Sequence, residues 1–282
     1  MDLVSVIIPS FNRFVFLLNA LESVKNQTYT NIEIIVINDN SDDENYYSYN
    51  WKDNNVKIIH LEKNSKKIFG YGCVGYVRNI GLKQSNGKWI AFCDDDDIWF
   101  PEKIEIQIKA MKENNCKMSS TDALWGKGIY DSNKTYKKFN KEKFFKTLQN
   151  IYLKNNSNLL LNGFPKIWNN DFIKIHNCII CSSVIIDKEI LNKINGMTHK
   201  RRGQDYQCWK KAIKYTDSIY IDKPLATSIA RADEIFNLQK YPGQIFTCSA
   251  LRYANEFILD ESTRTEIGVV KRIEATSIKD WD

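Results

Sequence analysis

Residues 89–97, Trp89-Ile90-Ala91-Phe92-Cys93-Asp94-Asp95-Asp96-Asp97, run from an apolar segment directly into four adjacent aspartates. The apolar segment is typical of a strand that is buried on both faces of a parallel sheet. Neighbouring carboxylates repel one another, and each raises the pKa of the next unless a cation neutralises them. Ligands of open α/β sheets bind beyond the carboxyl ends of the strands. The stretch therefore predicts a strand that ends at a divalent-metal site, and the alternative is an acidic, solvated turn.

Strands and helices alternate on both sides of this stretch. Apolar, β-branched runs predict further strands at residues 4–9, 32–37 and 56–61. Apolar residues at steps of three and four predict helices at 13–27 and 76–83, and a third helix that has Pro101 in its first turn. This order indicates an α/β protein with a doubly wound, mostly parallel central sheet flanked by helices.

The chain after residue 115 has a less regular pattern. Residues 122–175 are rich in lysine and asparagine, and we expect a packed helical insert with long loops. For the lysine-rich stretch between Trp125 and Trp168, a wall of an acceptor site or a contact with a membrane surface is the alternative. Further on, the sequence predicts a strand at 178–186, helices at 188–194 and 205–215, and a helical tail at 236–282.

Composition narrows the class of protein. With 43% apolar and 26% charged residues in 282, the chain has the composition of a folded globular protein. Its net charge of +6 favours anionic partners without requiring nucleic acid. We expect no signal peptide and no membrane span, because no apolar run approaches about 20 residues. The seven cysteines are odd in number and lie mostly in apolar segments, which indicates buried, reduced thiols and a cytoplasmic location.

Five motifs occur in order within the first 115 residues: VSVIIPSFNR (4–13), LESVKNQTY (21–29), IIVINDNS (34–41), RNIG (78–81) and DDDDIW (94–99). Weaker similarity continues in SSV (182–184), QDYQCW (204–209) and KPLAT (223–227). In this order the motifs resemble those of the family 2 glycosyltransferases, which have the Rossmann-like GT-A fold. The resemblance implies a catalytic domain over 1–235, with a nucleotide-sugar-binding half (1–115) and an acceptor half (116–235), followed by a helical C-terminal extension over 236–282.

The resemblance also implies an activity, namely transfer of a hexose or N-acetylhexosamine from a UDP-sugar with inversion at the anomeric carbon. It assigns Asp39 a hydrogen bond to uracil, and it assigns Asp94 and Asp96 the metal, Mn²⁺ or Mg²⁺. Polar residues satisfied within their own loops are the alternative for Asp39 and Arg78. The nucleotide-sugar site that the resemblance implies contains Pro9, Phe11, Arg13, Asp39, Arg78, Asp94 and Asp95.

Inversion by direct displacement requires a base for the acceptor hydroxyl. The resembling family often uses a Glu-Asp pair before a helix, and this chain has Gln204-Asp205, so Asp205 is the candidate base. Asp205 is also a suitable residue for capping the helix that follows. Just before it, Arg201 and Arg202 are candidates for contacting a diphosphate, and a solvated charged loop is the alternative.

The expected acceptor is a saccharide on a lipid diphosphate, as in repeat units of O-antigen or capsule, at the inner surface of the cell membrane. This part rests on the resemblance, and the positive net charge suits a peripheral enzyme on an anionic bilayer. A metal-dependent nucleotidyltransferase would carry a Gly-rich loop after its first strand, where this chain has residues 9–13. A non-catalytic carbohydrate-binding protein would not need the adjacent aspartates.

Overall fold

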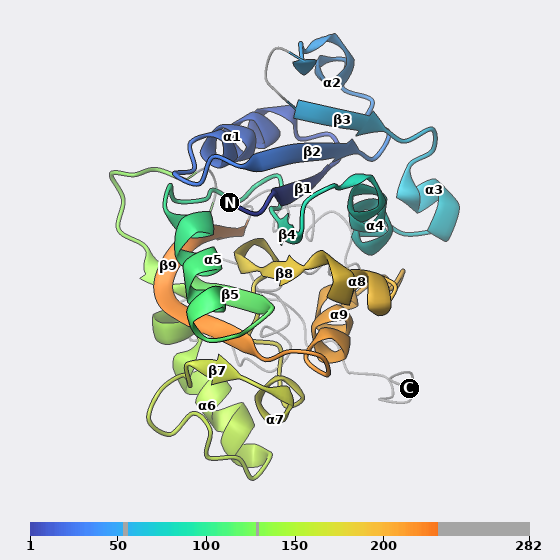
Figure 1. The fold of residues 1–282 in the computed structure, drawn as a ribbon. Coiled ribbons are helices and arrows are strands. Elements are labelled where there is room, and N and C mark those ends of the chain that lie inside the picture. The colour runs from blue at the N-terminus through green and yellow to red at the C-terminus, as the bar shows by residue number, and fades with distance from the viewer. Residues whose placement is uncertain (53–55, 128–129, 231–282) are drawn as a thin grey trace, which may run out of the picture. The chain divides into compact units, whose positions relative to one another are not determined.

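One mixed β-sheet organises the computed structural model, which describes residues 1–52, 56–127 and 130–230 (Figure 1). In the described residues the strand order is β3-β2-β1-β4-β8-β5-β9-β7, with β6 paired to β5. The predicted helical tail at 236–282 lies outside the described residues. So does the predicted boundary after residue 235, and the division into domains stays a prediction.

The first half of the sheet is parallel, as predicted. It consists of β1 (Val4–Ser10), β2 (Ile32–Asn38), β3 (Val56–His60) and β4 (Trp89–Phe92). The chain moves outward from β1 to β3 and then returns to place β4 on the other side of β1. The strand order therefore reverses at β1, and the carboxyl ends of β1, β2 and β4 meet there, where ligands of such sheets bind.

Helices cover this half of the sheet: α1 (Phe14–Lys25), α2 (Asn45–Ser48), α3 (Ser65–Phe69), α4 (Val74–Gln84) and α5 (Lys103–Glu113). The predicted apolar stripe of α1 is buried through Leu17, Leu21 and Val24. On α4, a Cβ at Gly81 would lie 2.5 Å from Cγ2 of Ile7. Glycine at this position therefore allows α4 to pack directly on β1.

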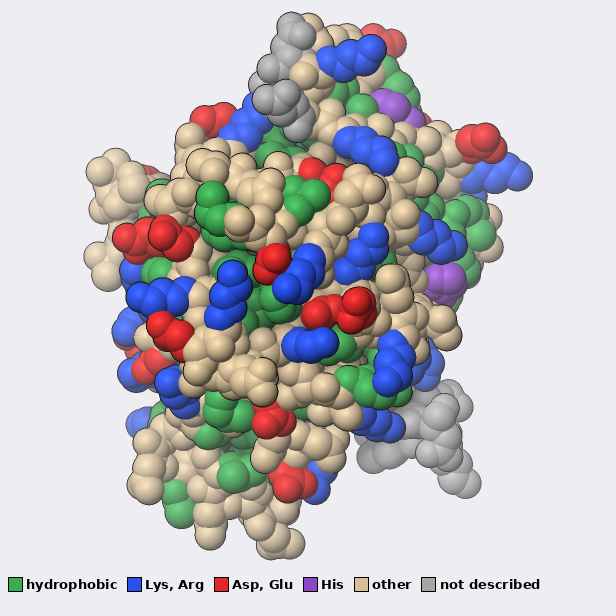
Figure 2. Space-filling model, viewed as in Figure 1, with side chains coloured by type: hydrophobic (Ala, Val, Ile, Leu, Met, Phe, Trp, Pro, Cys, Tyr) green, Lys and Arg blue, Asp and Glu red, His purple; other side chains and the backbone are tan. Residues whose placement is uncertain are grey.

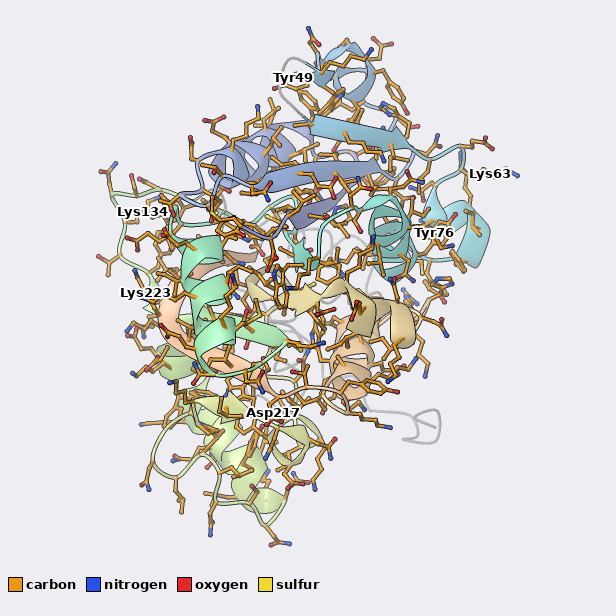
Figure 3. All side chains as sticks on the ribbon, in the orientation of Figure 1. Tyr49, Lys63, Tyr76, Lys134, Asp217 and Lys223 are labelled. Atoms are coloured by element: carbon orange, nitrogen blue, oxygen red, sulfur yellow. The ribbon has the colours of Figure 1, made fainter. Side chains whose placement is uncertain are left out.

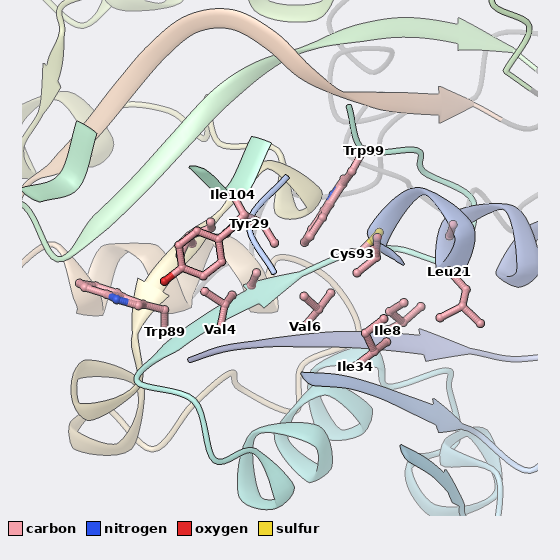
Figure 4. Packing of buried hydrophobic residues seen from close by; sticks show 14 of the residues in the cluster. Val4, Val6, Ile8, Leu21, Tyr29, Ile34, Trp89, Cys93, Trp99 and Ile104 are labelled. Carbon is pink, nitrogen blue, oxygen red and sulfur yellow. The ribbon is translucent and has the colours of Figure 1, made fainter. Parts of the chain in front are cut away.

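The core lies between the sheet and these helices. Figure 4 shows Val6 and Ile8 of β1 beside Cys93 and Trp99, which follow β4. Val6 and Ile8 are fully buried and Trp99 is 2% exposed, so the chain immediately after β4 packs into the core. Consistent with the cysteine prediction, the six cysteines in the described part of the chain are free and buried.

The second half of the sheet joins β5 (Met118–Lys127), β6 (Lys137–Lys138), β7 (Ile167–Trp168), β8 (Ile185–Asp187) and β9 (Ser218–Ala230). Here β8 is antiparallel to both β4 and β5, whereas β9 is parallel to β5. The helical elements of this half are η2 (Phe139–Lys143), α6 (Phe145–Lys154), α7 (Asn170–Ile173), η3 (Cys181–Ser183), α8 (Lys188–Lys193) and α9 (Gln204–Ala212). Figure 3 shows Lys223 of β9 beside α5, where its Nζ lies 2.6 Å from Oε2 of Glu102.

Two predictions for this half are correct only in part. The strand predicted at 178–186 is reduced to β8, because Ser183 turns back through N–H and Oγ hydrogen bonds to the carbonyl oxygen of Ile180 and forms η3. Residues 122–175 contain the end of β5 together with β6 and β7, in addition to the expected helices. Strand β9 was not predicted at all. No helix within 1–52, 56–127 or 130–230 is long and apolar enough to cross a bilayer.

Candidate active site

Hydrogen bonds join the loops that follow β1, β2 and β4. The backbone N–H of Asp39 donates to the carbonyl oxygen of Ser10 (2.9 Å), and the N–H of Asn12 donates to Oγ of Ser41 (2.9 Å). Oγ of Ser10 then donates to Oδ2 of Asp95 (2.7 Å). Residues from three of the quoted motifs thus meet at the edge of the sheet where the strand order reverses.

The four aspartates after β4 differ in their environments. Asp95 and Asp97 are 3% and 5% exposed. Oδ1 of Asp95 accepts a hydrogen bond from Nη1 of Arg13 (2.8 Å), and the same nitrogen lies 3.6 Å from Oδ2 of Asp96. A solvated acidic turn would leave all four side chains in water, so this alternative does not describe the segment. The structure brings Arg13 together with Asp95 and Asp96.

Arg78 on α4 compensates the charge of Asp94. Its Nη2 lies 2.5 Å from Oδ1 of Asp94, and its guanidinium is almost completely buried. Burial alone would lower the pKa of Arg78, but the charge of Asp94, with a smaller contribution from Asp205, raises it above its ordinary value. Arg78 therefore stays charged and lies within electrostatic reach of both carboxylates.

Asp94 and Asp96 have the chemistry of a hard-cation site that is completed by substrate. Their side chains are 33% and 14% exposed at the end of β4. Among the described residues, no group of three or more His, Cys, Asp or Glu side chains could hold a metal by itself. Mg²⁺ and similar cations commonly take one or two carboxylates and fill their remaining positions with water and phosphate oxygens. The pair fits such an ion in the presence of a diphosphate.

Asp39 is held by a residue that the sequence analysis did not identify. Its Oδ1 accepts the backbone N–H of Ser65 (2.7 Å), and its Oδ2 accepts the hydroxyl of Ser65 (2.6 Å), at the start of α3. Burial raises the pKa of Asp39, and these two hydrogen bonds oppose the rise. The alternative, that Asp39 is satisfied within its own loop, is therefore correct only in part. Both carboxylate oxygens do accept hydrogen bonds, but the donor, Ser65, comes from a neighbouring loop. Both carboxylate oxygens keep further lone pairs for a ligand.

Asp205 lies in the first turn of α9, where Gly203 occupies the N-cap position. The alternative interpretation required Asp205 to be the N-cap residue, and it is not. Nδ2 of Asn177 lies 3.4 Å from Oδ2 of Asp205. The next residue, Tyr206, donates its hydroxyl to the carbonyl oxygen of Ile173 (2.7 Å). These contacts attach the beginning of α9 to α7 and its following loop.

The remaining predicted site residues lie nearer the surface or within the sheet. Pro9 is buried in β1, whereas Phe11 is 41% exposed just beyond the end of β1. Arg201 and Arg202 are exposed in the loop between α8 and α9. This loop approaches α4 so closely that a Cβ at Gly75 would lie 2.4 Å from the carbonyl oxygen of Thr198.

The sequence analysis also did not identify the buried residues that support the aspartates from behind. Oγ of Ser182 accepts the N–H of Asp94 (3.0 Å), and its carbonyl oxygen accepts the indole N–H of Trp99 (2.9 Å). Nζ of Lys103 lies 3.9 Å from the Trp99 ring centre and donates to Oε1 of Gln107 (2.7 Å). Burial lowers the pKa of Lys103 to about 7. The SSV motif at 182–184 was the signal available for Ser182, whereas nothing in the sequence pointed to Lys103.

Comparison with known protein families identifies a matching family. The sequence model of glycosyl transferase family 2 matches residues 5–191, more than half of the chain. The chain belongs to this family. The match covers the loops after β1, β2 and β4 and continues through β8.

Relatives in this family include enzymes with named reactions. The chain is 31% identical over 218 residues to the Escherichia coli UDP-Glc:alpha-D-GlcNAc-diphosphoundecaprenol beta-1,3-glucosyltransferase WfgD, with 75% of this chain and 70% of that protein covered. It is 34% identical over 209 residues to an uncharacterized glycosyltransferase of Rickettsia bellii, with 73% of this chain covered. The chain spans 26% of that protein and 32% of a Rickettsia felis relative.

Solved structures show the same GT-A fold as this family 2 member. Residues 1–349 of S. aureus TarS in complex with UDP-GlcNAc align with a TM-score of 0.57 and 20% identity, covering 81% of this chain and 59% of that chain. The mannosyltransferase PcManGT from Pyrobaculum calidifontis, in complex with GDP-Man and Mn²⁺, aligns with a TM-score of 0.54 and 13% identity, covering 85% and 61%. The GT-A expectation is therefore confirmed.

Proposed function

We propose that this chain is an inverting glycosyltransferase that moves a hexose or N-acetylhexosamine from a UDP-sugar to a saccharide on a lipid diphosphate. The relatives WfgD and WfaP of Escherichia coli are named for UDP-Glc and an α-D-GlcNAc-diphosphoundecaprenol acceptor. Two solved TarS structures contain UDP and UDP-GlcNAc. Membership of a glycosyltransferase family argues against the alternative of a nucleotidyltransferase.

The observation that carries the proposal is the ion pair between the buried guanidinium of Arg78 and Asp94, on which the charge of Asp205 also acts more weakly. Asp94 lies on the donor side at the end of β4, and Asp205 lies at the start of α9. The charges of both raise the pKa of Arg78, so both lie within electrostatic reach of one buried guanidinium. A donor diphosphate at Asp94 would thus be close to a base that can accept the proton of an incoming hydroxyl.

In the proposed reaction, Asp205 accepts the proton of the acceptor hydroxyl while that oxygen bonds to the anomeric carbon. The bond between this carbon and the β-phosphate oxygen breaks, and UDP leaves with the electron pair. Asp94 and Asp96 would hold Mn²⁺ or Mg²⁺, which supplies positive charge to the leaving diphosphate. Arg13 orients Asp95 and Asp96 through its guanidinium.

Asp39 would accept the N3–H of uracil, since its carboxylate is fixed by Ser65 and retains lone pairs. Pro9 and Phe11 would flank the base at the end of β1, and Arg201 and Arg202 would contact a diphosphate from the loop before Asp205. We place the protein in the cytoplasm, at the inner face of the membrane where lipid-linked acceptors are found.

Calorimetry of UDP binding, with and without Mn²⁺, tests the donor site. We expect binding that requires both the metal and Asp96, so that Asp96→Ala loses the metal-dependent part of the affinity. A screen of UDP-hexoses for hydrolysis and for transfer to a lipid-diphosphate saccharide then identifies the donor. Equal UDP affinity with and without metal would refute the role of the aspartates, and absence of UDP binding would refute the donor class.

A further inference from the structure

Positive charge is concentrated in one segment of the chain. Residues 137–166 contain seven lysines and one glutamate, a net charge of +6. The other 252 residues contain 33 basic and 33 acidic residues, so their net charge is zero. The positive charge of the whole chain is therefore a property of the segment that runs from β6 through α6 to the start of β7.

The same segment exposes leucines. Leu153, Leu159 and Leu161 are 44%, 42% and 50% exposed. They fall within nine residues at the end of α6 and in the turns that follow it. Figure 2 shows hydrophobic side chains on the surface of the lobe at the bottom of the view, which Figure 1 identifies as the lobe of α6, β7 and α7.

These leucines are not required to fill the interior of the lobe. The interior is packed by aromatic rings, among them Trp168 and Tyr220, which stack with centroids 4.3 Å apart. Helix α6 contributes Leu148 and Tyr152 to the buried side, and both are completely buried. The interior of the lobe is thus packed without the three exposed leucines. Exposed apolar side chains that gather in one place mark an interaction surface.

Lys146 and Leu153 of α6 share one face. Lys146, Gln149 and Leu153 follow one another at steps of three and four, which places them on the same side of the helix. Nε2 of Gln149 donates to the carbonyl oxygen of Leu160 (3.1 Å), so the turn that carries Leu159 and Leu161 folds over this side. Lys146 is exposed on this side, and Lys154, which is also exposed, follows Leu153 at the end of α6.

This lobe is also attached to the candidate acceptor side of the active site. The hydroxyl of Tyr206, next to Asp205, donates to the carbonyl oxygen of Ile173 in α7, and Tyr152 of α6 donates to the carbonyl oxygen of Phe172 (2.8 Å). Two hydrogen bonds therefore connect α6 to the helix of the candidate base through α7. The lobe is thus attached to the helix that carries the candidate base.

We infer that the face of residues 146–161 that carries Lys146, Leu153, Lys154, Leu159 and Leu161 docks on an anionic phospholipid bilayer. This inference rests on the proposed function, because it places the bilayer beside the site of a lipid-linked acceptor. Leucines enter the boundary between headgroups and acyl chains, and lysines at the same level attract anionic headgroups. One lobe would thus both bind the membrane and hold the helix of the base.

Vesicle co-sedimentation of the full chain tests the inference. The vesicles contain phosphatidylglycerol in phosphatidylethanolamine, and phosphatidylcholine vesicles provide the uncharged comparison. We expect Leu153→Gln/Leu159→Gln/Leu161→Gln to lower the partition coefficient by at least about tenfold. Lys146→Gln/Lys154→Gln should lower it by about fivefold for each lysine, and only on anionic vesicles at low salt.

Matched controls carry the same substitutions elsewhere. Val15→Gln/Ile68→Gln replaces apolar residues that are 64% and 45% exposed, and Lys109→Gln/Lys112→Gln replaces exposed lysines of α5. Neither control should change partitioning. Equal losses in the controls, or binding of the wild type to phosphatidylcholine as strong as to anionic vesicles, would overturn the inference.

Measurements without membranes separate this inference from the proposed function. In an assay without detergent or membranes, using an acceptor analogue with a short lipid, the leucine and lysine variants should transfer sugar at the wild-type rate. Transfer by a wild type that does not bind vesicles would overturn the inference and leave the function intact. Vesicle binding by a protein that neither binds UDP nor transfers sugar would overturn the function, together with the placement of the acceptor.

Discussion

Asp94 and Asp96 should differ sharply in their contribution to stability, although both are assigned to the same metal. Asp94 neutralises Arg78, whose side chain is 4% exposed and whose Nε has no hydrogen-bond partner. Asp94→Asn would leave this guanidinium buried without its nearest counter-charge. Removing one partner of a buried ion pair commonly costs about 3–5 kcal/mol. Because Asp94 is one-third exposed and the charge of Asp205 remains, we expect a loss of about 2–3 kcal/mol in the free energy of unfolding.

Asp96→Asn should cost much less. Nη1 of Arg13 lies 3.6 Å from Oδ2 of Asp96 and makes a shorter contact of 2.8 Å to Asp95. A contact of this kind contributes about 0–1 kcal/mol, so we expect a loss of no more than about 0.5 kcal/mol. In UDP calorimetry, however, both variants should lose the metal-dependent part of the affinity.

Urea unfolding at pH 7, followed by tryptophan fluorescence, measures the difference. A double-mutant cycle with Arg78→Met and Asp94→Asn isolates the pair, and we expect a coupling energy of about 2 kcal/mol. Equal stability losses in Asp94→Asn and Asp96→Asn, or a coupling energy below about 0.5 kcal/mol, would refute the role given to Arg78.

Three further predictions concern the base, the nucleotide pocket and the layer behind the aspartates. Asp205→Asn should lower kcat by about 10²- to 10⁴-fold and leave the affinity for UDP unchanged, as measured by UDP release and calorimetry. Ser65→Ala removes the hydroxyl that fixes Oδ2 of Asp39, so UDP affinity should fall by up to about tenfold in calorimetry. Because burial lowers the pKa of Lys103 to about 7 and an unfolded lysine titrates near pH 10, the unfolded state binds more protons between these values. Stability should therefore rise with pH by about 1.4 kcal/mol per unit across this window, relative to Lys103→Met in urea titrations.

Each of these outcomes has a contrary result. A loss of UDP affinity in Asp205→Asn would move this residue from the acceptor side to the donor site. An unchanged affinity in Ser65→Ala would separate Asp39 from the nucleotide. The Lys103 comparison uses the difference between two proteins because buried cysteines such as Cys93, whose pKa burial raises, oppose the trend in both of them. Parallel pH profiles for the wild type and Lys103→Met would contradict a deprotonated lysine in the core.

The edge of the sheet where the loops after β1, β2 and β4 meet could be predicted from sequence, because its residues follow their strands directly. The motifs VSVIIPSFNR and IIVINDNS each contain a strand and the start of the loop after it, and DDDDIW follows β4 directly. The parallel order of β1, β2 and β4 brings those three loops to one edge. What could not be predicted are partners from other loops. Ser65 lies 26 residues beyond Asp39, and no local pattern indicates that its hydroxyl turns toward that carboxylate.

Strand β5, in the second half of the sheet, was missed because it does not have the sequence pattern of a buried strand. Its residues Ser119, Ser120, Thr121 and Asp122 are polar, consecutive and almost completely buried. Asp122 is stabilised there by N–H groups of Asn140 (2.8 Å) and Lys141 (3.2 Å), which lie in η2. Periodicity rules assume that burial follows hydrophobicity, and this strand is buried through hydrogen bonds that come from 18 residues away.

Helix α4 contacts residues of both proposed halves of the site, the donor half and the acceptor half. Its Arg78 lies against Asp94, and its Gly75 lies against the loop that leads to Asp205. A side chain at position 75 would push that loop away, and a neutral residue at position 78 would leave Asp94 without its buried counter-charge. One helix therefore touches both proposed halves, and its RNIG motif had indicated the nucleotide pocket alone.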